Sequence, residues 1–325
     1  MNTGFRIYNK SIRVCMLLLL VLLPLSCIKD DSVSKETATV MMTFSTRAIN
    51  SSGSSVDGLE ANEHMRTLRV IVARSSNSEI LYNLKYDIAE DEKSKIIRFN
   101  EMTVNAEGEA FDFYAIANED GVGYTEKNWD NVTVEDLKGM TLQTGFLTDA
   151  NDASTNTRIP QTAYKQITVK PLDGGGMQSE TMKLDFAVAK VRLTINNTSV
   201  GDQYVKDIEL SGLNMASTPL FAGESLSTEK QDKLSLGDLT IHADESATVY
   251  AYFFENMESN YALSASWNET TKTLDITRAV IPNITQISRG TALDINITLN
   301  ATTTPTFNIG VVPWTTVEVD VPPFE

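Results

Sequence analysis

The side chains that most often carry out chemistry in proteins are scarce in this 325-residue chain. It has two histidines, His64 and His242, and two cysteines, Cys15 and Cys27. Neither histidine has a second ligand type at metal-binding spacing, and no GxSxG, HExxH or phosphate-binding glycine motif occurs. We therefore expect surface histidines, no bound metal or other cofactor, and no enzymatic activity.

Carboxylates are abundant, with 43 Asp and Glu residues, and two of them facing a sugar would be enough for a glycosidase. At this number some carboxylates pair by chance, so a hydrolase ranks last among the functions considered. Tyr124, Trp129 and Trp267 could stack on sugar rings, although scattered aromatic residues more often pack in a core or an interface.

Cys27 is the residue best placed for a chemical modification. It ends the run LLPLSC, which follows a basic segment and an apolar stretch over residues 14–25. That stretch is too short to span a membrane and is typical of a signal peptide. LLPLSC resembles a bacterial lipobox, which implies removal of residues 1–26 and a lipid on Cys27. An ordinary secretory signal with an incidental cysteine is the alternative.

The residues behind Cys27 and the overall charge also favour export. The run IKDD resembles the export signal of surface lipoproteins, with a solvated charged linker as the alternative. Removing residues 1–26 takes away three cations, so the formal net charge of −16 becomes −19. An acidic chain disfavours nucleic acid as a partner, because phosphate binding needs a basic face.

Most patterned segments are typical of β-strands. The predicted strands cover residues 68–73, 80–88, 110–116, 183–195, 247–254 and 292–299. The first two flank a polar turn and predict a hairpin. One short helix is predicted, with Thr133 as N-cap, Asp136 completing a capping box and Gly139 at its end. These elements favour an all-β fold of sandwiches over an alternating α/β sheet.

Residues 37–50, TATVMMTFSTRAIN, join a core-type strand to a linker that is open to proteases. Apolar residues alternate with less apolar ones, as in a half-buried strand. The core-facing set is Ala38, Val40, Met42 and Phe44. Arg47 and a Ser/Gly-rich stretch follow directly, so Arg47 is a candidate cleavage site, with a chance linker arginine as the alternative.

Five segments in this order resemble the fimbrillins, the type V pilins of Bacteroidales: FDFYAIANEDG, TVEDLKGM, LDFAVAKVRLTI, SRGTALDINITL and VVPW. The resemblance implies two transthyretin-like β-sandwich domains with one short helix. It also implies secretion as an outer-membrane lipoprotein and cleavage between Arg47 and Ala48 by an Arg-specific protease. The cut would release the first strand, and the C-terminal strand of a neighbouring subunit would take its place.

These features predict four regions along the chain. They are a signal peptide at 1–26, a lipidated propeptide at 27–47, an N-terminal sandwich at 48–177 and a C-terminal sandwich at 178–325. The boundary at 177 follows the flexible run DGGG, residues 173–176.

The C-terminal region, about 306–325, has the alternation expected of a donor strand. Its candidate residues are Phe307, Ile309, Val311, Val317, Val319 and Val321. Such a strand could equally fold back onto its own domain, and the pattern does not separate the two outcomes.

We therefore expect a structural or accessory subunit of a surface pilus that supports adhesion. Its expected partners are other pilus subunits, the processing protease and the outer membrane, with a receptor on a host or bacterial surface as a further candidate. The alternative is a surface-exposed glycan-binding lipoprotein that keeps its lipid anchor.

Overall fold

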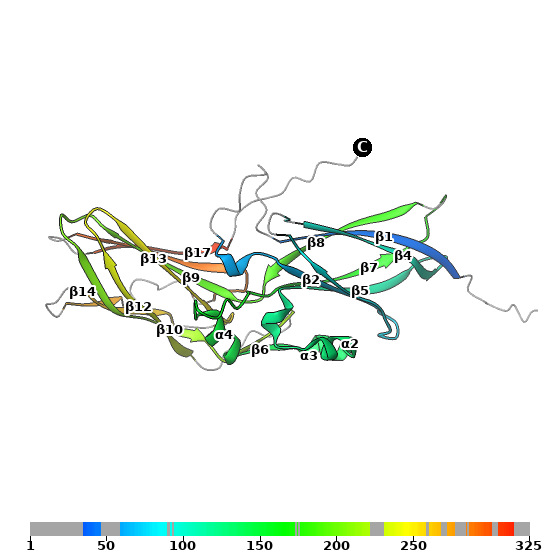
Figure 1. The fold of residues 1–325 in the computed structure, drawn as a ribbon, viewed down its shortest axis with the longest axis horizontal. Coiled ribbons are helices and arrows are strands. Elements are labelled where there is room, and N and C mark those ends of the chain that lie inside the picture. Colours follow the sequence, from blue (N-terminus) through cyan, green and yellow to red (C-terminus); the bar gives the residue numbers. More distant parts are fainter. Residues whose placement is uncertain are drawn as a thin grey trace, which may run out of the picture.

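The computed structural model describes residues 35–46, 59–89, 92, 94–172, 174, 176–221, 231–257, 260–267, 272–276, 284, 286–300 and 305–314. Two groups of strands follow one another along the long axis of the molecule (Figure 1). The all-β sandwich architecture predicted from the strand patterns is confirmed.

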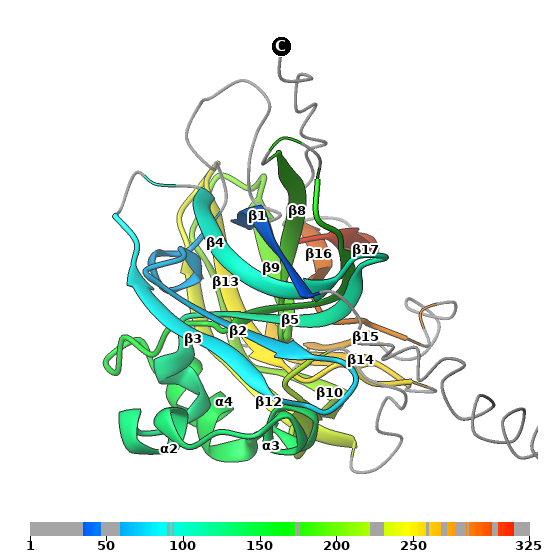
Figure 2. The same ribbon diagram turned by 90° about the vertical axis from the view of Figure 1, so that its right-hand side faces the viewer.

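The first group is a seven-stranded sheet in the order β3-β2-β5-β7-β8-β1-β4. Only two residue pairs join β7 to β8, so the sheet turns there and its two halves face each other across one apolar core. Figure 2 shows β1 and β4 on one side and β2, β3 and β5 on the other. The strands are β1 (Lys35–Thr46), β2 (Thr67–Arg74), β3 (Ile80–Asp87), β4 (Ser94–Asn105), β5 (Glu109–Ala117), β7 (Gln161–Val169) and β8 (Met177–Phe186).

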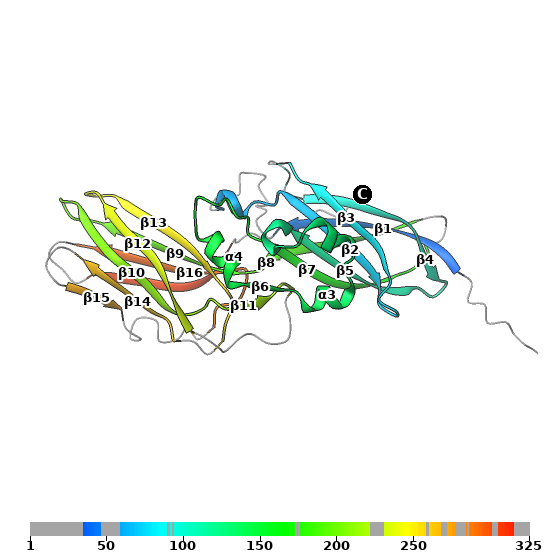
Figure 3. The same cartoon turned by 60° about the horizontal axis from the view of Figure 1, so that its bottom comes forward.

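The second group is a sandwich of two four-stranded sheets, β12-β10-β14-β15 and β13-β9-β16-β17 (Figure 3). Alternate residues of both sheets point inward, so Leu193, Leu210 and Ile295 share one core and are fully buried. The strands are β9 (Ala189–Asn197), β10 (Gln203–Asn214), β12 (Gln231–Ile241), β13 (Ser246–Phe253), β14 (Ala262–Trp267), β15 (Lys272–Ile276), β16 (Thr291–Leu299) and β17 (Thr306–Pro313).

Short helices cover the outer face of β2 and β5 (Figures 2 and 3). They are α2 (Glu126–Asp130), α3 (Val134–Gly139) and α4 (Thr144–Ala150). Single 3-10 turns also form at η2 (Ala61–Glu63) and η3 (Glu119–Val122). The predicted helix is α3, and its capping box is present: Thr133 N donates to Asp136 Oδ2 at 2.9 Å and Asp136 N to Thr133 Oγ1 at 3.1 Å. The expectation of a single helix was wrong, because α2 and α4 also form.

Five of the six predicted strands are confirmed as β2, β3, β5, β13 and β16, and β2 and β3 form the predicted hairpin. The prediction of one continuous strand at 183–195 was wrong. The chain leaves the first sheet at Phe186 and enters the second sandwich at Ala189, and Ala187 and Val188 between them are fully buried. An apolar run that is buried throughout has no periodicity to mark such a crossing.

The crossing also moves the boundary between the sandwiches. Strand β8 pairs with β1 and β7, so it belongs to the first sheet although it lies beyond the expected boundary at 177. The run at 173–176 connects β7 to β8 within the first sandwich. The small two-stranded sheet of β6 (Thr141–Gln143) and β11 (Ser217–Pro219) lies where the two sandwiches meet (Figure 3).

Candidate functional site

Strand β1 lies inside the first sheet, with a hydrogen-bonded neighbour on each side. It runs antiparallel to β4, with Val40 opposite Phe99, and parallel to β8, with Phe44 opposite Met182. The pairing with β4 shifts register between Ala38 and Val40. The first described strand of the chain is therefore held by main-chain hydrogen bonds along both edges.

The four side chains predicted to face the core do so. Ala38 is 5% exposed, and Val40, Met42 and Phe44 are 0% exposed. Full burial of a large apolar side chain contributes about 1.5–3 kcal/mol, so these three together contribute about 5–9 kcal/mol. Strand β1 is thus a major part of the first core.

Strand β4 depends on β1 for its place in the sheet, because β1 is its one sheet neighbour among the described strands. The buried side chains Ile97, Phe99 and Met102 of β4 belong to the same core as β1. Removal of β1 would leave both β4 and β8 with unpaired edges around an open apolar groove. Such a groove fits an extended strand with an apolar side chain at every second position.

The predicted donor residues of β17 lie within their own domain. Strand β17 pairs antiparallel with β16, with Phe307 opposite Ile297 and Ile309 opposite Ile295. Phe307 and Ile309 are partly buried against the second core, and Val311 is 39% exposed. In this state β17 is folded back onto its own domain, the outcome that its sequence left open.

Several predicted site residues lie outside the described part of the chain. They are Cys27, Arg47, Ala48, Val317, Val319 and Val321. The expected signal peptide at 1–26 lies outside it as well.

A buried polar cluster holds the end of β17 at the junction of the two sandwiches. Trp314 is 8% exposed and stacks on Phe186, with ring centres 4.1 Å apart. Its Nε1 donates to Glu63 Oε2 at 3.0 Å. Glu63 is 0% exposed and pairs with Lys190 Nζ at 2.7 Å. One carboxylate therefore joins η2, β9 and the residue that follows β17.

Tyr252 of β13 completes this cluster. Its hydroxyl donates to Glu63 Oε1 at 2.8 Å, and its ring stacks on Trp314 with the centres 5.7 Å apart. Burial, reinforced by the charge of Glu63, raises the pKa of Tyr252, so it remains a neutral donor. Nothing in the sequence pattern marked Glu63, Lys190 or Tyr252 as members of a cluster, and Trp314 stood out only as part of the motif VVPW.

The described residues were predicted to hold no metal site, and their histidines to lie at the surface. Among the described residues, no group of three or more His, Cys, Asp and Glu side chains could hold a metal ion. His242 lies at the surface, with Nδ1 3.1 Å from Asp202 Oδ2. Over the same ranges, no helix is both long and apolar enough to cross a bilayer.

No protein-family model matches the chain, and no curated protein matches its sequence. Solved structures do match its fold. The tip fimbrial protein Mfa3 from Porphyromonas gingivalis is 12% identical with a TM-score of 0.55, covering 86% of this chain and all of Mfa3 as crystallised with a C-terminal truncation.

Two proteins from Parabacteroides distasonis are similar in the same way. A proposed cell adhesion protein is 15% identical, with a TM-score of 0.54 and coverage of 87% of this chain and 98% of its own. A fimbrial assembly protein is 13% identical, with a TM-score of 0.51 and coverage of 88% of this chain and all of its own. The chain thus has the fold of Bacteroidales fimbrial and cell adhesion proteins, as its resemblance to the fimbrillins implies.

Proposed function

We propose that this protein is a structural or accessory subunit of a cell-surface pilus, supports adhesion and has no catalytic activity of its own. The shared fold with fimbrial proteins supports this role, as do the fimbrillin-like segments. Other pilus subunits are its principal partners. The lipid on Cys27 holds the precursor at the outer membrane until processing.

Assembly proceeds by exchange of β1 for a strand of another subunit. An Arg-specific protease cuts between Arg47 and Ala48, β1 leaves, and the groove between β4 and β8 accepts the donor. The observation that carries this proposal is the position of β1. It is paired on both sides within the sheet and fully buried at Val40, Met42 and Phe44, yet precedes the rest of the described chain. A single cut behind it therefore frees it without opening the sandwich elsewhere.

The donor lies within residues 306–325. Trp314 fixes the chain at the junction, so the segment with Val317, Val319 and Val321 begins there. Its alternating valines suit the period-2 side-chain positions of the groove. For β17 to contribute Phe307, Ile309 and Val311 as well, it must first separate from β16.

The test is polymerisation of the purified full-length chain after limited trypsin digestion, followed on gels without boiling. Wild type should be cut first after Arg47 and give a ladder of oligomers. Arg47→Ala should give neither this first cut nor the ladder. Arg278→Ala is the matched control, because Arg278 also stands between Thr and Ala, and it should behave like wild type.

The donor is tested with a chain that ends before Thr306 and with Val319→Asp. The truncated subunit should be cut normally but fail as donor, while still accepting the tail of an intact subunit. Val319→Asp should shorten the ladder, because it places a charge in an apolar groove. Ladders of equal length from the truncated chain would rule out exchange through this terminus.

A further inference from the structure

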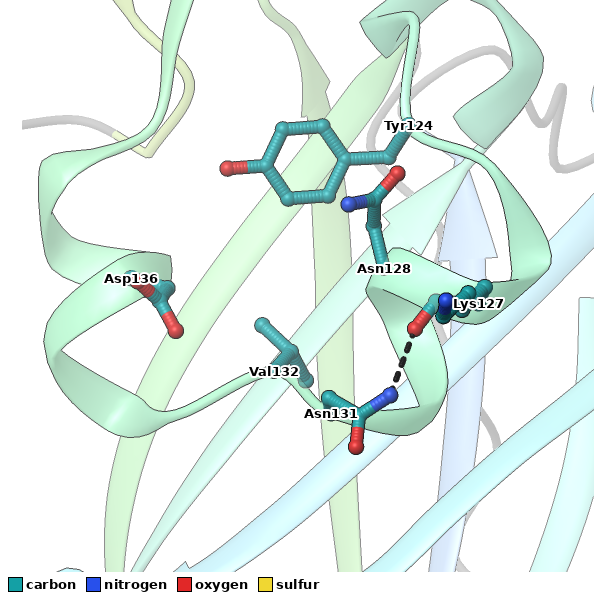
Figure 4. Close-up of a pocket in the computed structure, with 6 residues that line it drawn as sticks. All are labelled: Tyr124, Lys127, Asn128, Asn131, Val132 and Asp136. Carbon is teal, nitrogen blue, oxygen red and sulfur yellow. Dashed lines mark hydrogen bonds between the residues drawn. The ribbon is translucent and has the colours of Figure 1, made fainter.

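A surface pocket of about 400 Å³ lies between α2 and α3, beyond the parts of the molecule used for assembly (Figure 4). Its lining combines one aromatic ring, two amides, one carboxylate, one ammonium group and one apolar side chain. The residues are Tyr124, Lys127, Asn128, Asn131, Val132 and Asp136. Figure 4 shows the two amides on one side of the pocket and Asp136 on the other.

Tyr124 offers a partly exposed aromatic surface that is backed by a second ring. It is 38% exposed, and its ring packs on Trp129 with the centres 5.1 Å apart. Trp129 is 1% exposed and is itself covered by the Arg69 guanidinium at 5.0 Å. A partly exposed ring that packs on a buried indole is a platform for the C–H face of a sugar ring.

Asn128 presents an amide donor to the pocket. Its Oδ1 accepts from Thr125 N at 3.1 Å and from Thr125 Oγ1 at 2.6 Å. Because a backbone N–H can only donate, the oxygen must face Thr125 and the NH₂ group must face away from it. No other described residue accepts from that NH₂ group.

Asp136 and Asn131 present acceptors. Asp136 Oδ2 is occupied by Thr133, with Oγ1 at 2.7 Å, and these bonds lower the pKa of Asp136. The carboxylate is therefore ionised at neutral pH, with Oδ1 unbonded within the described residues. The Asn131 NH₂ group donates to Lys127 O at 2.8 Å, which leaves the Asn131 oxygen as an acceptor.

The pocket is held rigidly against the sheet below it. Asn83 Nδ2 of β3 donates to Trp129 O at 2.8 Å, and Arg69 Nη2 of β2 donates to Glu126 Oε2 at 2.8 Å. Lys85 of β3 also pairs with Glu126. A preformed site loses less conformational entropy when a ligand binds.

We propose that this pocket binds a neutral sugar residue of a surface glycan. Vicinal hydroxyls both donate and accept, so one pyranose ring can pair with the Asn128 donor and the Asp136 acceptor while it packs on Tyr124. The formal net charge of −16 disfavours acidic glycans. The pocket also lies on the far side of β2 and β5 from β1, so strand exchange leaves it open (Figure 2).

The experiment measures binding of the full-length monomeric chain to immobilised neutral glycans ending in galactose, mannose, fucose or N-acetylglucosamine, with sialylated and sulfated glycans alongside. Wild type should bind at least one neutral class. Tyr124→Ala should weaken binding about tenfold, whereas Tyr124→Phe keeps the ring and should stay within about threefold.

Tyr204→Ala is the matched control, because Tyr204 is 44% exposed on β10 of the other sandwich, and it should bind like wild type. Asn131→Ala removes one exposed acceptor without touching the core, so it should weaken binding severalfold even if Tyr124→Ala fails to fold. The proposal is overturned if no neutral glycan binds, if only acidic glycans bind, or if Tyr124→Ala and Asn131→Ala bind like wild type. Because the chain is monomeric in this assay, failure of polymerisation does not affect the result.

Discussion

Strands β1 and β17 begin and end the described chain and hold opposite positions in their sheets. Strand β1 has neighbours on both sides and three side chains with no exposed surface. Among the described strands, β17 pairs with β16 alone, its apolar residues line the edge of the second core, and Val311 is exposed. The two sequences alternate in the same way, but loss of β1 would remove fully buried side chains from a core, whereas loss of β17 would remove partly buried ones.

This difference separates the two roles that strand exchange requires. A strand that must be replaced should have a sheet neighbour on each side, so that the vacated groove holds its substitute tightly. A strand that moves to another molecule should cost little to detach from its own sheet. The four predictions below test that contrast, beginning with the largest expected effect.

Removal of residues 1–47 should destabilise the first sandwich by about 5–9 kcal/mol, because Val40, Met42 and Phe44 leave its core. That loss is comparable with the whole stability of many domains. Urea unfolding of the shortened chain should show an early transition that is absent from the full chain. A peptide covering residues 306–325 should shift this transition back, and a single unshifted transition would contradict the central role of β1.

Phe44→Ala and Phe307→Ala compare the same deletion in the two strands. Phe44 is 0% exposed and should cost about 3–5 kcal/mol, whereas Phe307 is only partly buried and should cost less than half as much. The measurement is the change in unfolding free energy from urea titration. Equal losses would show that β17 is held as firmly as β1.

Trp314→Phe tests the anchor at the end of β17. It removes an indole N–H that donates to the buried carboxylate of Glu63, and bonds to charged groups are worth about 1.5–3 kcal/mol. Trp267→Phe is the control, because its indole donates at 2.8 Å to the neutral amide of Gln203 and should cost about 0.5–1.5 kcal/mol. Thermal unfolding should rank the variants in this order, and the reverse ranking would argue against the anchor.

The smallest effect concerns β16, the sheet neighbour of β17, and its other neighbour β9. Arg192 Nε of β9 donates to Asp294 Oδ1 of β16 at 2.7 Å, which lowers the pKa of Asp294 below its ordinary value of 3.8. This stabilisation is therefore present above about pH 4 and is lost as the pH falls through the folded-state pKa. Because Arg192 is 41% exposed, Asp294→Asn should cost at most about 1 kcal/mol at pH 7.

The check is the urea midpoint of wild type and Asp294→Asn at several pH values. The two midpoints should differ at pH 7 and approach each other below the ordinary Asp pKa of 3.8. A difference that grows in acid would mean that another titrating group controls the pH dependence.

Local patterns predicted much of what the structure contains. The hairpin of β2 and β3 follows from alternation on both sides of a polar turn, and the α3 capping box follows from the spacing of Thr133 and Asp136. The inward set of β1 follows from its period of two. Patterns did not predict α2 or α4, because each helix is shorter than two full turns and so shows no clear apolar periodicity. Both helices are stabilised by packing in the tertiary structure.

The sequence by itself determined which residues of β1 face a core, because a strand turns alternate side chains to one side whatever its neighbours are. Only the tertiary structure decided that β1 lies between β4 and β8. Thr39 pairs with Met177, and the residues around neither position indicate which distant strand will be the partner. Likewise, Glu63, Lys190 and Trp314 are charged and aromatic residues scattered along the sequence, and they become one buried cluster because the two sandwiches exclude water where they meet.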